Sequence, residues 1–200
     1  DSFKGCLTSA EAGKAAEKGI KSINPFCHTS VIPIADGGEG LLDVLITATK
    51  GKYITLSAHG PLMKMAKTHY GLSGNGRTAI IEMAAISGLP LVPIEQRNPM
   101  LTTTFGTGEL IKDALNKGCR NFIIGIGGSA TNDAGLGMLQ ALGFRFLDKS
   151  GHTLGTGGQI MEAVANIDTS GIHPALRETH FMVACDVANP FYGPDGAAYI

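Results

Sequence analysis

The residues best suited to binding or catalysis lie in a glycine-rich stretch, 125–135, that follows the apolar run 121–124. The stretch carries four polar side chains of kinds that contact phosphate groups or metal-bound water: Ser129, Thr131, Asn132 and Asp133. A strand that ends in glycines and then enters a helix presents backbone N–H groups and the positive end of the helix dipole, which together bind anions. We therefore predict an anion-binding loop here, with an ordinary glycine turn as the alternative.

This glycine loop matches neither of the general nucleotide-binding signatures. Ala130 stands where the pattern G-x-G-x-x-G requires its last glycine, and the lysine of the phosphate-binding pattern G-x-x-x-x-G-K is absent. The loop does follow a predicted strand, and open α/β sheets bind ligands where their strands end. The sequence thus predicts the place of a ligand site better than the identity of its ligand.

A second glycine loop is acidic. It consists of Asp36, Gly37, Gly38, Glu39 and Gly40, and an apolar, helix-like run follows it. Acids at a helix start often serve as caps, which is the simpler interpretation. Because glycines let a ligand approach the backbone closely, the interleaving of acids and glycines favours a Mg²⁺ or substrate-hydroxyl site.

Three further charged residues stand in positions suited to catalysis. Lys4 could be a surface lysine, or could neutralise a transferred phosphoryl group. Arg97 offers a fork-shaped cation in an irregular segment, where ordinary loop chemistry is the alternative. Asp186 follows the apolar strand predicted at 181–184, which suits a catalytic base or a metal ligand.

The elements that position these residues alternate between helices and short apolar strands. Helices are predicted at 9–23, with Ser9 as cap, after residue 40, and at 106–117, with Thr107 as cap. Strands are predicted at 28–33, 53–56, 67–72, 77–81, 121–124, 144–147 and 181–184. The three strands between 53 and 81 are expected to be antiparallel. The whole pattern predicts an α/β protein with a parallel sheet and one hairpin-rich insert.

From residue 51 the apolar residues recur with a period of two, typical of strands, instead of the helical spacing of the preceding run, and this change predicts two domains. We predict that residues 1–50 begin one α/β domain, that 51–184 form a second one with a mixed sheet, and that 185–200 return toward the first. The chain begins in a loop that should follow a strand and stops within an apolar run. It is therefore expected to be a piece of a longer protein.

Composition narrows the range of partners. The net charge is −1 without a basic run, so we expect no nucleic-acid partner. The four cysteines form no CxxC pair, which favours reduced thiols and a cytoplasmic protein. No stretch has the length of a membrane span, so no membrane partner is expected. The six histidines show no metal-ligand spacing.

Six blocks of the sequence, in order, resemble the glycerate kinase family of the bacterial glycerate 2-kinase type. The blocks are 1–5, 33–40, 81–89, 97–110, 125–133 and 185–190. Small departures are Cys6 for a usual serine, Leu41 for a usual threonine, and Ala134 for a frequent second glycine. Leu41 matters most among them, because it removes a hydroxyl from the neighbourhood of the acidic loop.

The resemblance implies ATP-dependent phosphorylation of D-glycerate with Mg²⁺, giving 2-phosphoglycerate or, less often, 3-phosphoglycerate. It implies a Rossmann/flavodoxin-like parallel-sheet domain plus a second mixed-sheet α/β domain, and a possible homodimer. On this basis the expected substrate-binding residues are Ser2, Asp36, Gly37, Gly38, Glu39 and Arg97. The expected ATP-binding residues are Gly127, Gly128, Ser129, Thr131 and Asn132. Lys4, Asp133 and Asp186 are expected to be catalytic, and the two aspartates also to bind the metal.

Two other classes of function stay open on the sequence. A different α/β enzyme acting on a small hydroxy acid, such as a dehydrogenase, would need a dinucleotide fingerprint, which is absent. A non-catalytic sensor of glycerate or a similar hydroxy acid would share most of the same residues. Release of ADP in the presence of hydroxy acids would separate these classes.

Overall fold

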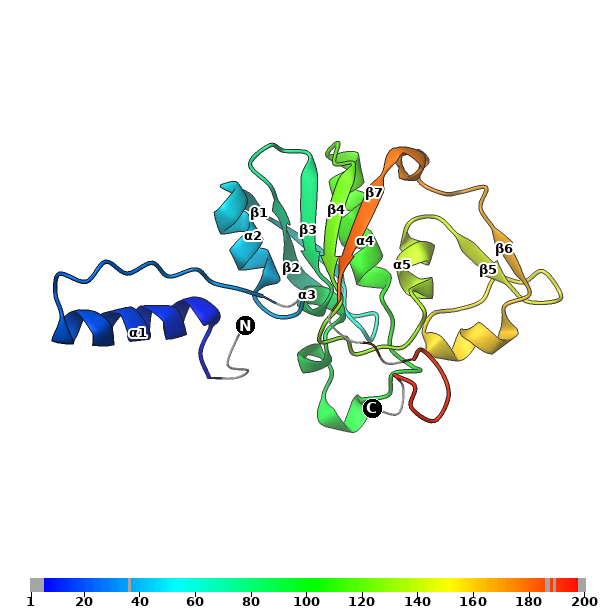
Figure 1. Ribbon diagram of the computed structural model, residues 1–200. Helices are drawn as coiled ribbons and strands as arrows, with labels where there is room; N and C mark the ends of the chain where they lie inside the picture. Colours follow the sequence, from blue (N-terminus) through cyan, green and yellow to red (C-terminus); the bar gives the residue numbers. More distant parts are fainter. Residues whose placement is uncertain (1–5, 36, 186–187, 189, 198–200) are drawn as a thin grey trace.

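The computed structural model describes residues 6–35, 37–185, 188 and 190–197. At its centre lies a mixed five-stranded sheet with the strand order β1-β2-β3-β4-β7 (Figure 1). The strands are β1 Lys52–His59, β2 Met65–Leu72, β3 Thr78–Glu82, β4 Asn121–Gly125 and β7 His180–Ala184. The first three are joined by antiparallel pairing, whereas β3, β4 and β7 are parallel. The α/β class expected from the sequence is confirmed.

The alternation of residues along β3 divides the core between the two faces of the sheet. Ala79 and Ile81 belong to the larger apolar cluster, which includes residues of helix α4 (Phe105–Asn116). Ile80 between them packs with Leu42 and Ile46 of helix α2 (Leu41–Thr49). Because successive strand residues point to opposite faces, α2 and α4 cover opposite sides of the sheet (Figure 1).

Helix α5 (Leu136–Ala141) lies beside α4 at very short range. A side chain added at Gly108 would place its Cβ 2.3 Å from the carbonyl oxygen of Met138, so α4 needs a glycine where the two helices meet. The hydroxyl of Thr107 is buried and lies 2.9 Å from that of Ser87, in the short helix α3 (Ala84–Ser87). Thr107 is therefore part of the packing, and its predicted role as a helix cap is wrong. The N-cap is Thr104, and α4 begins at Phe105, one residue before the predicted start at 106.

A small lobe and several short turns complete the described fold (Figure 1). In the lobe, β5 (Arg145–Leu147) pairs antiparallel with β6 (Asn166–Asp168), and an Arg145–Asp168 ion pair joins them. The 3₁₀ turns are Leu89–Leu91, Ile94–Gln96, Gly158–Ala163 and Pro174–Glu178. Among the described residues, no helix has both the length and the apolar character needed to cross a membrane.

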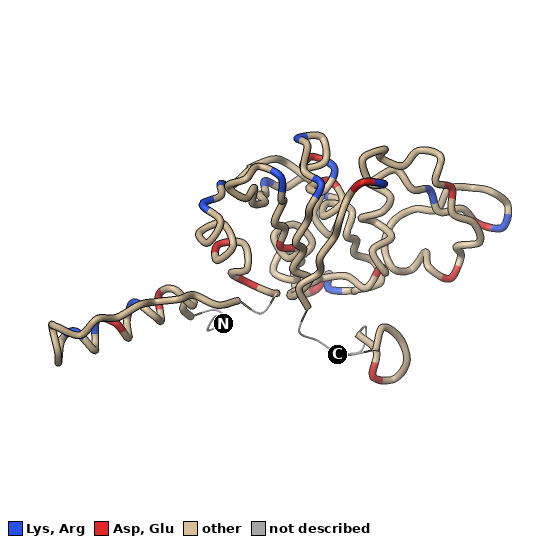
Figure 2. The backbone as a smooth tube through the Cα atoms, turned by 45° about the horizontal axis from the view of Figure 1, so that its top comes forward, with Lys and Arg blue, Asp and Glu red and all other residues tan. Residues whose placement is uncertain are grey.

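Helix α1 (Ser9–Ile23) extends away from the sheet, and the segment 24–35 runs back along it (Figure 1). Lys and Glu positions are interspersed along this helix (Figure 2). The helix was predicted, but its cap is Thr8, which forms a capping box with Glu11. The predicted cap, Ser9, instead accepts a hydrogen bond from the backbone N–H of Ile34.

The strand predicted at 28–33 is absent: these residues form no ladder within the described part of the chain. A β-branched run becomes a strand only when a neighbouring strand pairs with its N–H and C=O groups, and the described sheet ends at β1 on one side and at β7 on the other. Helix α2, which was predicted to belong to the 1–50 domain, packs on β2 and β3. The predicted division into domains stays a prediction.

Candidate functional site

The carboxyl ends of the three parallel strands meet at one edge of the sheet. Glu82 at the end of β3 pairs with Gly125 at the end of β4, which pairs in turn with Ala184 at the end of β7. The chain that follows each of these residues therefore leaves the sheet at the same place. Ligands of open α/β sheets bind at such an edge, and it is where the glycine loop begins.

The acidic loop rests directly on this edge. The backbone N–H of Gly127 donates to the carbonyl oxygen of Gly37 at 3.3 Å. Gly37 has φ +98°, and a Cβ there would lie 2.7 Å from the carbonyl oxygen of Ala184. A Cβ at Gly127 would lie 2.7 Å from the Cα of Gly38. The two glycine loops predicted from the sequence are thus in backbone contact, which residues with side chains would prevent.

The middle of the glycine loop runs alongside the segment that follows α3. The carbonyl oxygen of Gly128 accepts a hydrogen bond from the N–H of Leu89 at 3.0 Å, and the N–H of Ala130 donates to the carbonyl of Ser87 at 2.9 Å. The Ser129 hydroxyl accepts from the N–H of Thr131 and donates to its carbonyl. Gly128 is exposed and Gly127 partly so, which leaves this stretch of backbone accessible to a ligand.

The next two residues tie the loop to the segment that contains Arg97. The hydroxyl of Thr131 donates to the carbonyl oxygen of Thr102 at 2.7 Å, and the N–H of Asn132 donates to that of Pro99 at 2.9 Å. Arg97 itself is exposed, and its Nε donates to the carbonyl of Val92 at 3.2 Å. The structure therefore attaches the Arg97 segment to the glycine loop through Pro99 and Thr102.

Asp133 is buried, with 1% of its surface exposed. Its carboxylate accepts five kinds of hydrogen bond, from the N–H and hydroxyl of Thr104, the hydroxyl of Thr103, and the N–H groups of Gly135 and Gly137. These donors belong to the starts of α4 and α5. The contacts favour a structural role that joins two helix starts, so the predicted catalytic and metal-binding roles of Asp133 remain predictions without support from its surroundings.

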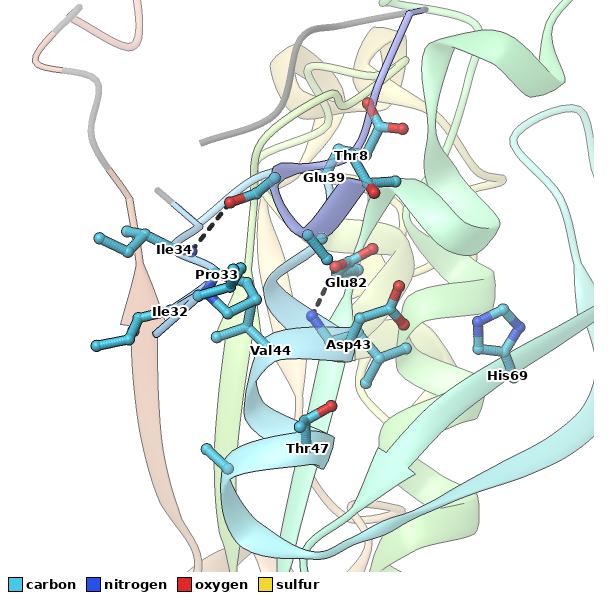
Figure 3. A pocket seen from close by; sticks show the side chains of 16 residues that line it. Thr8, Ile32, Pro33, Ile34, Glu39, Asp43, Val44, Thr47, His69 and Glu82 are labelled. Atoms are coloured by element: carbon cyan, nitrogen blue, oxygen red, sulfur yellow. Dashed lines mark hydrogen bonds between the residues drawn. The ribbon is translucent and has the colours of Figure 1, made fainter. Parts of the chain in front are cut away.

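Glu39, the acid of the second loop that the structure describes, lines a cavity of about 540 Å³. The cavity lies between α2, the beginning of α1 and the extended segment 31–34 (Figure 3). Its titratable lining residues are Glu39, Asp43, His69 and Glu82. Apolar side chains of the 31–34 segment and of α2 form much of the remaining wall, and the hydroxyl-bearing residues Thr8, Ser9 and Thr47 also line it. The cavity thus combines an acidic side with an apolar side.

Two hydrogen bonds organise the acidic side. Oε1 of Glu82 accepts the N–H of Leu42 at 2.7 Å, shown by a dashed line in Figure 3. Burial raises the pKa of Glu82, and the nearby Asp43 carboxylate adds to this, while the N–H groups of Leu42 and Gly40 act in the opposite direction. The hydroxyl of Tyr53 donates to Asp43 at 2.5 Å, and this bond is the main cause that raises the pKa of Tyr53 to about 12.

Apart from Glu39, the sequence did not single out the residues on this side. Glu82 was part of a block that resembles the family, but it was given no role. His69 was one of the six histidines without metal-ligand spacing, and Asp43 and Tyr53 were given no chemical role. A signal for Glu82 did exist, since it is a carboxylate at the end of an apolar strand, the same feature that drew attention to Asp186. The predicted site residues Ser2, Lys4, Asp36 and Asp186 lie outside the described residues.

A metal site is not evident from the side chains that the structure describes. Within that part of the chain, no group of three or more His, Cys, Asp or Glu residues is arranged to hold an ion. Of the two predicted ligands, Asp133 has its oxygens occupied by protein donors and Asp186 is not described. The described residues therefore do not fit a protein-only Mg²⁺ site, and no step of a reaction is assigned to the ion.

Comparison with known proteins gives the same family as the six sequence blocks that resemble glycerate kinases. The chain is 52% identical over 200 residues to a glycerate kinase of Bacillus subtilis (strain 168), covering 100% of this chain and 52% of that protein. It is 48% identical to the glycerate 2-kinase of Escherichia coli (strain K12), again over the whole chain and 52% of the relative. The chain spans about half the length of the curated relatives it matches.

A solved structure extends the match to three dimensions. The crystal structure of a putative glycerate kinase 2 from Salmonella typhimurium LT2 superposes with a TM-score of 0.87 at 48% sequence identity, covering 100% of this chain and 54% of that one. The model of the glycerate kinase family matches residues 1–200. The chain therefore belongs to the glycerate kinase family.

Proposed function

We propose that the protein transfers the γ-phosphoryl group of ATP to a hydroxyl of D-glycerate and forms 2-phosphoglycerate. The observation that carries this proposal is the backbone contact between Gly37 and Gly127, in a chain that belongs to the family. It joins an acidic loop suited to sugar-like hydroxyls and a glycine loop suited to phosphates at one edge of the sheet. A phosphoryl transfer needs its donor and acceptor side by side, and the contact between the two loops would bring them together.

The phosphates of ATP are assigned to the loop at Gly127, Gly128 and Ser129. The N–H of Gly127 already donates to the carbonyl of Gly37, so the N–H groups of Gly128 and Ser129 are the better phosphate donors. The contacts of Thr131 and Asn132 support a different task for these two, because their hydrogen bonds hold the loop against the 97–104 segment. Both residues then shape the nucleotide site through the backbone that they fix. The side-chain hydroxyl of Ser129 is already engaged with Thr131, so its backbone is the better candidate for phosphate.

The glycerate hydroxyls are assigned to Asp36 and Glu39, and further substrate contacts to Ser2 and the Gly37–Gly38 backbone. The glycerate carboxylate is assigned to Arg97. Arg97 is exposed and lies in the segment tied to the glycine loop, which suits a planar cation that clamps a carboxylate. Lys4 is assigned the developing phosphoryl charge, and Asp186 the hydroxyl proton. Asp133 takes the structural task described above.

Mg²⁺ is part of the proposal as the ion that accompanies ATP. Magnesium keeps several waters and is commonly held by substrate phosphates together with one or two carboxylates, so a site without a ready-made protein cage is compatible with it. Asp186 is the residue assigned to hold it. A cytoplasmic location is proposed because the four cysteines form no CxxC pair, a pattern typical of reduced thiols, and a homodimer is retained as an expectation.

The test is an ADP-release assay of the complete natural polypeptide with ATP and a panel of hydroxy acids, followed by phosphorus NMR of the product. D-Glycerate should be the preferred acceptor, and the new phosphorus resonance should come from a phosphate group on the C2 oxygen. A phosphorus resonance from a phosphate group on the C3 oxygen would overturn only the proposed position of phosphorylation. Tight binding of glycerate without ADP release would overturn the kinase proposal and favour a sensor.

A further inference from the structure

The start of helix α2 lacks a cap of its own. Gly40 occupies the N-cap position, has no side chain to accept a hydrogen bond, and adopts a left-handed conformation. The first N–H groups of a helix need acceptors from elsewhere. Since α2 begins directly after the acidic loop, whatever fixes its first turn also fixes Glu39.

Glu82 supplies that acceptor from another part of the chain. Its Oε1 lies 2.7 Å from the nitrogen of Leu42, forty residues away in sequence, and it is anchored at the end of β3, where it pairs with Gly125. The other end of the acidic loop is held by the contact of Gly37 with Gly127. Glu39 therefore lies between two attachments, one made by backbone and one made by a single side chain.

From this arrangement we infer that Glu82 is a positioning residue for substrate: it caps α2 and thereby holds Glu39 where the hydroxy acid binds. The inference rests on the proposed function for its substrate, but the capping geometry does not depend on it. Glu82 acts through Glu39 and through the first turn of α2. Glu82 and Glu39 line the same cavity, so the capping residue and the residue that it positions border the same space.

Two variants separate the effect of the hydrogen bond to Leu42 from the effect of the negative charge of Glu82. Glu82→Gln retains a carbonyl oxygen that can accept the N–H of Leu42, whereas Glu82→Ala removes the acceptor. In the complete natural polypeptide we expect Glu82→Ala to raise the KM for D-glycerate about tenfold and to leave the KM for ATP within about twofold. Glu82→Gln should recover most of this loss.

Glu109→Ala is the matched control. Glu109 also binds a backbone N–H at 2.7 Å, that of His59, but it lies on α4 and ties the end of β1, away from the acidic loop. This variant should lose comparable stability and keep the KM for glycerate. If the two alanine variants shift both KM values equally, Glu82 has a merely structural role and the inference is overturned.

A measurement without substrate keeps the inference independent of the proposed function. Amide hydrogen exchange of the segment 37–45, followed by mass spectrometry, should accelerate in Glu82→Ala, return toward the wild-type rate in Glu82→Gln, and stay unchanged in Glu109→Ala. Unchanged exchange in Glu82→Ala would overturn the cap whatever the enzyme does. A wild-type protein that is inactive on glycerate would overturn the proposed function and leave the cap to be judged by exchange alone.

Discussion

Asp133 and Glu82 are carboxylates that hold the beginnings of helices, and they do so in opposite ways. Asp133 is almost fully buried and surrounded by donors from both α4 and α5. Glu82 is half-buried, accepts the N–H of Leu42, and lines a cavity. A saturated buried carboxylate fixes its surroundings in one arrangement, whereas one that borders a cavity can influence what the cavity binds. The glycine loop is thus built rigidly, and the acidic loop depends on fewer contacts.

The largest effect in this comparison is expected from Asp133→Ala. The substitution leaves several buried N–H and hydroxyl donors without their acceptor, and each such donor costs on the order of 1–3 kcal/mol. We expect the free energy of unfolding to fall by roughly 3 kcal/mol or more, measured by urea denaturation monitored by circular dichroism. Asp133→Asn keeps one oxygen and should lose less. A loss below about 1 kcal/mol in Asp133→Ala would contradict the saturated arrangement.

An intermediate effect is expected where the two loops touch. Gly37 and Gly40 both have positive φ, of +98° and +90°, so alanine strains the backbone similarly at each. A Cβ at Gly37 would also meet the carbonyl of Ala184, while nothing lies within 4 Å of a Cβ at Gly40. Gly37→Ala should therefore destabilise the protein by about 1–3 kcal/mol more than Gly40→Ala. Equal thermal stability of the two variants would refute the close backbone contact.

These two regions also show what the sequence could and could not predict. The period-two runs predicted β1, β2 and β3, and the glycine loop was correctly placed after a strand, because both depend on neighbouring residues. The contacts of Asp133 with Thr103 and Thr104 and the cap of Leu42 by Glu82 join distant parts of the chain. The failed strand at 28–33 has the same cause, since a strand requires a partner that its own sequence does not specify.

The smallest effect on stability is expected at Tyr53, whose hydroxyl binds Asp43 on the acidic side of the cavity. Its hydroxyl bond to Asp43 raises its pKa from 10.0 to about 12 in the folded protein. Because the folded pKa lies above the unfolded one, the bond stabilises the protein fully below about pH 10, and its contribution is lost as the pH rises toward 12. Tyr53 is 48% exposed, so Tyr53→Phe should cost less than about 1 kcal/mol near neutral pH.

Denaturation of wild type and Tyr53→Phe at a series of pH values tests this sign. The difference between the two proteins should be constant below about pH 10 and shrink above it, as far as the fold survives. Tyr70 serves as an internal reference, because burial raises its pKa further still, so Tyr53 should ionise before it in an absorbance titration. A stability difference that grows with rising pH would show that Asp43 does not hold the Tyr53 proton, and the acidic side of the cavity would then lack the bond that links α2 to β1.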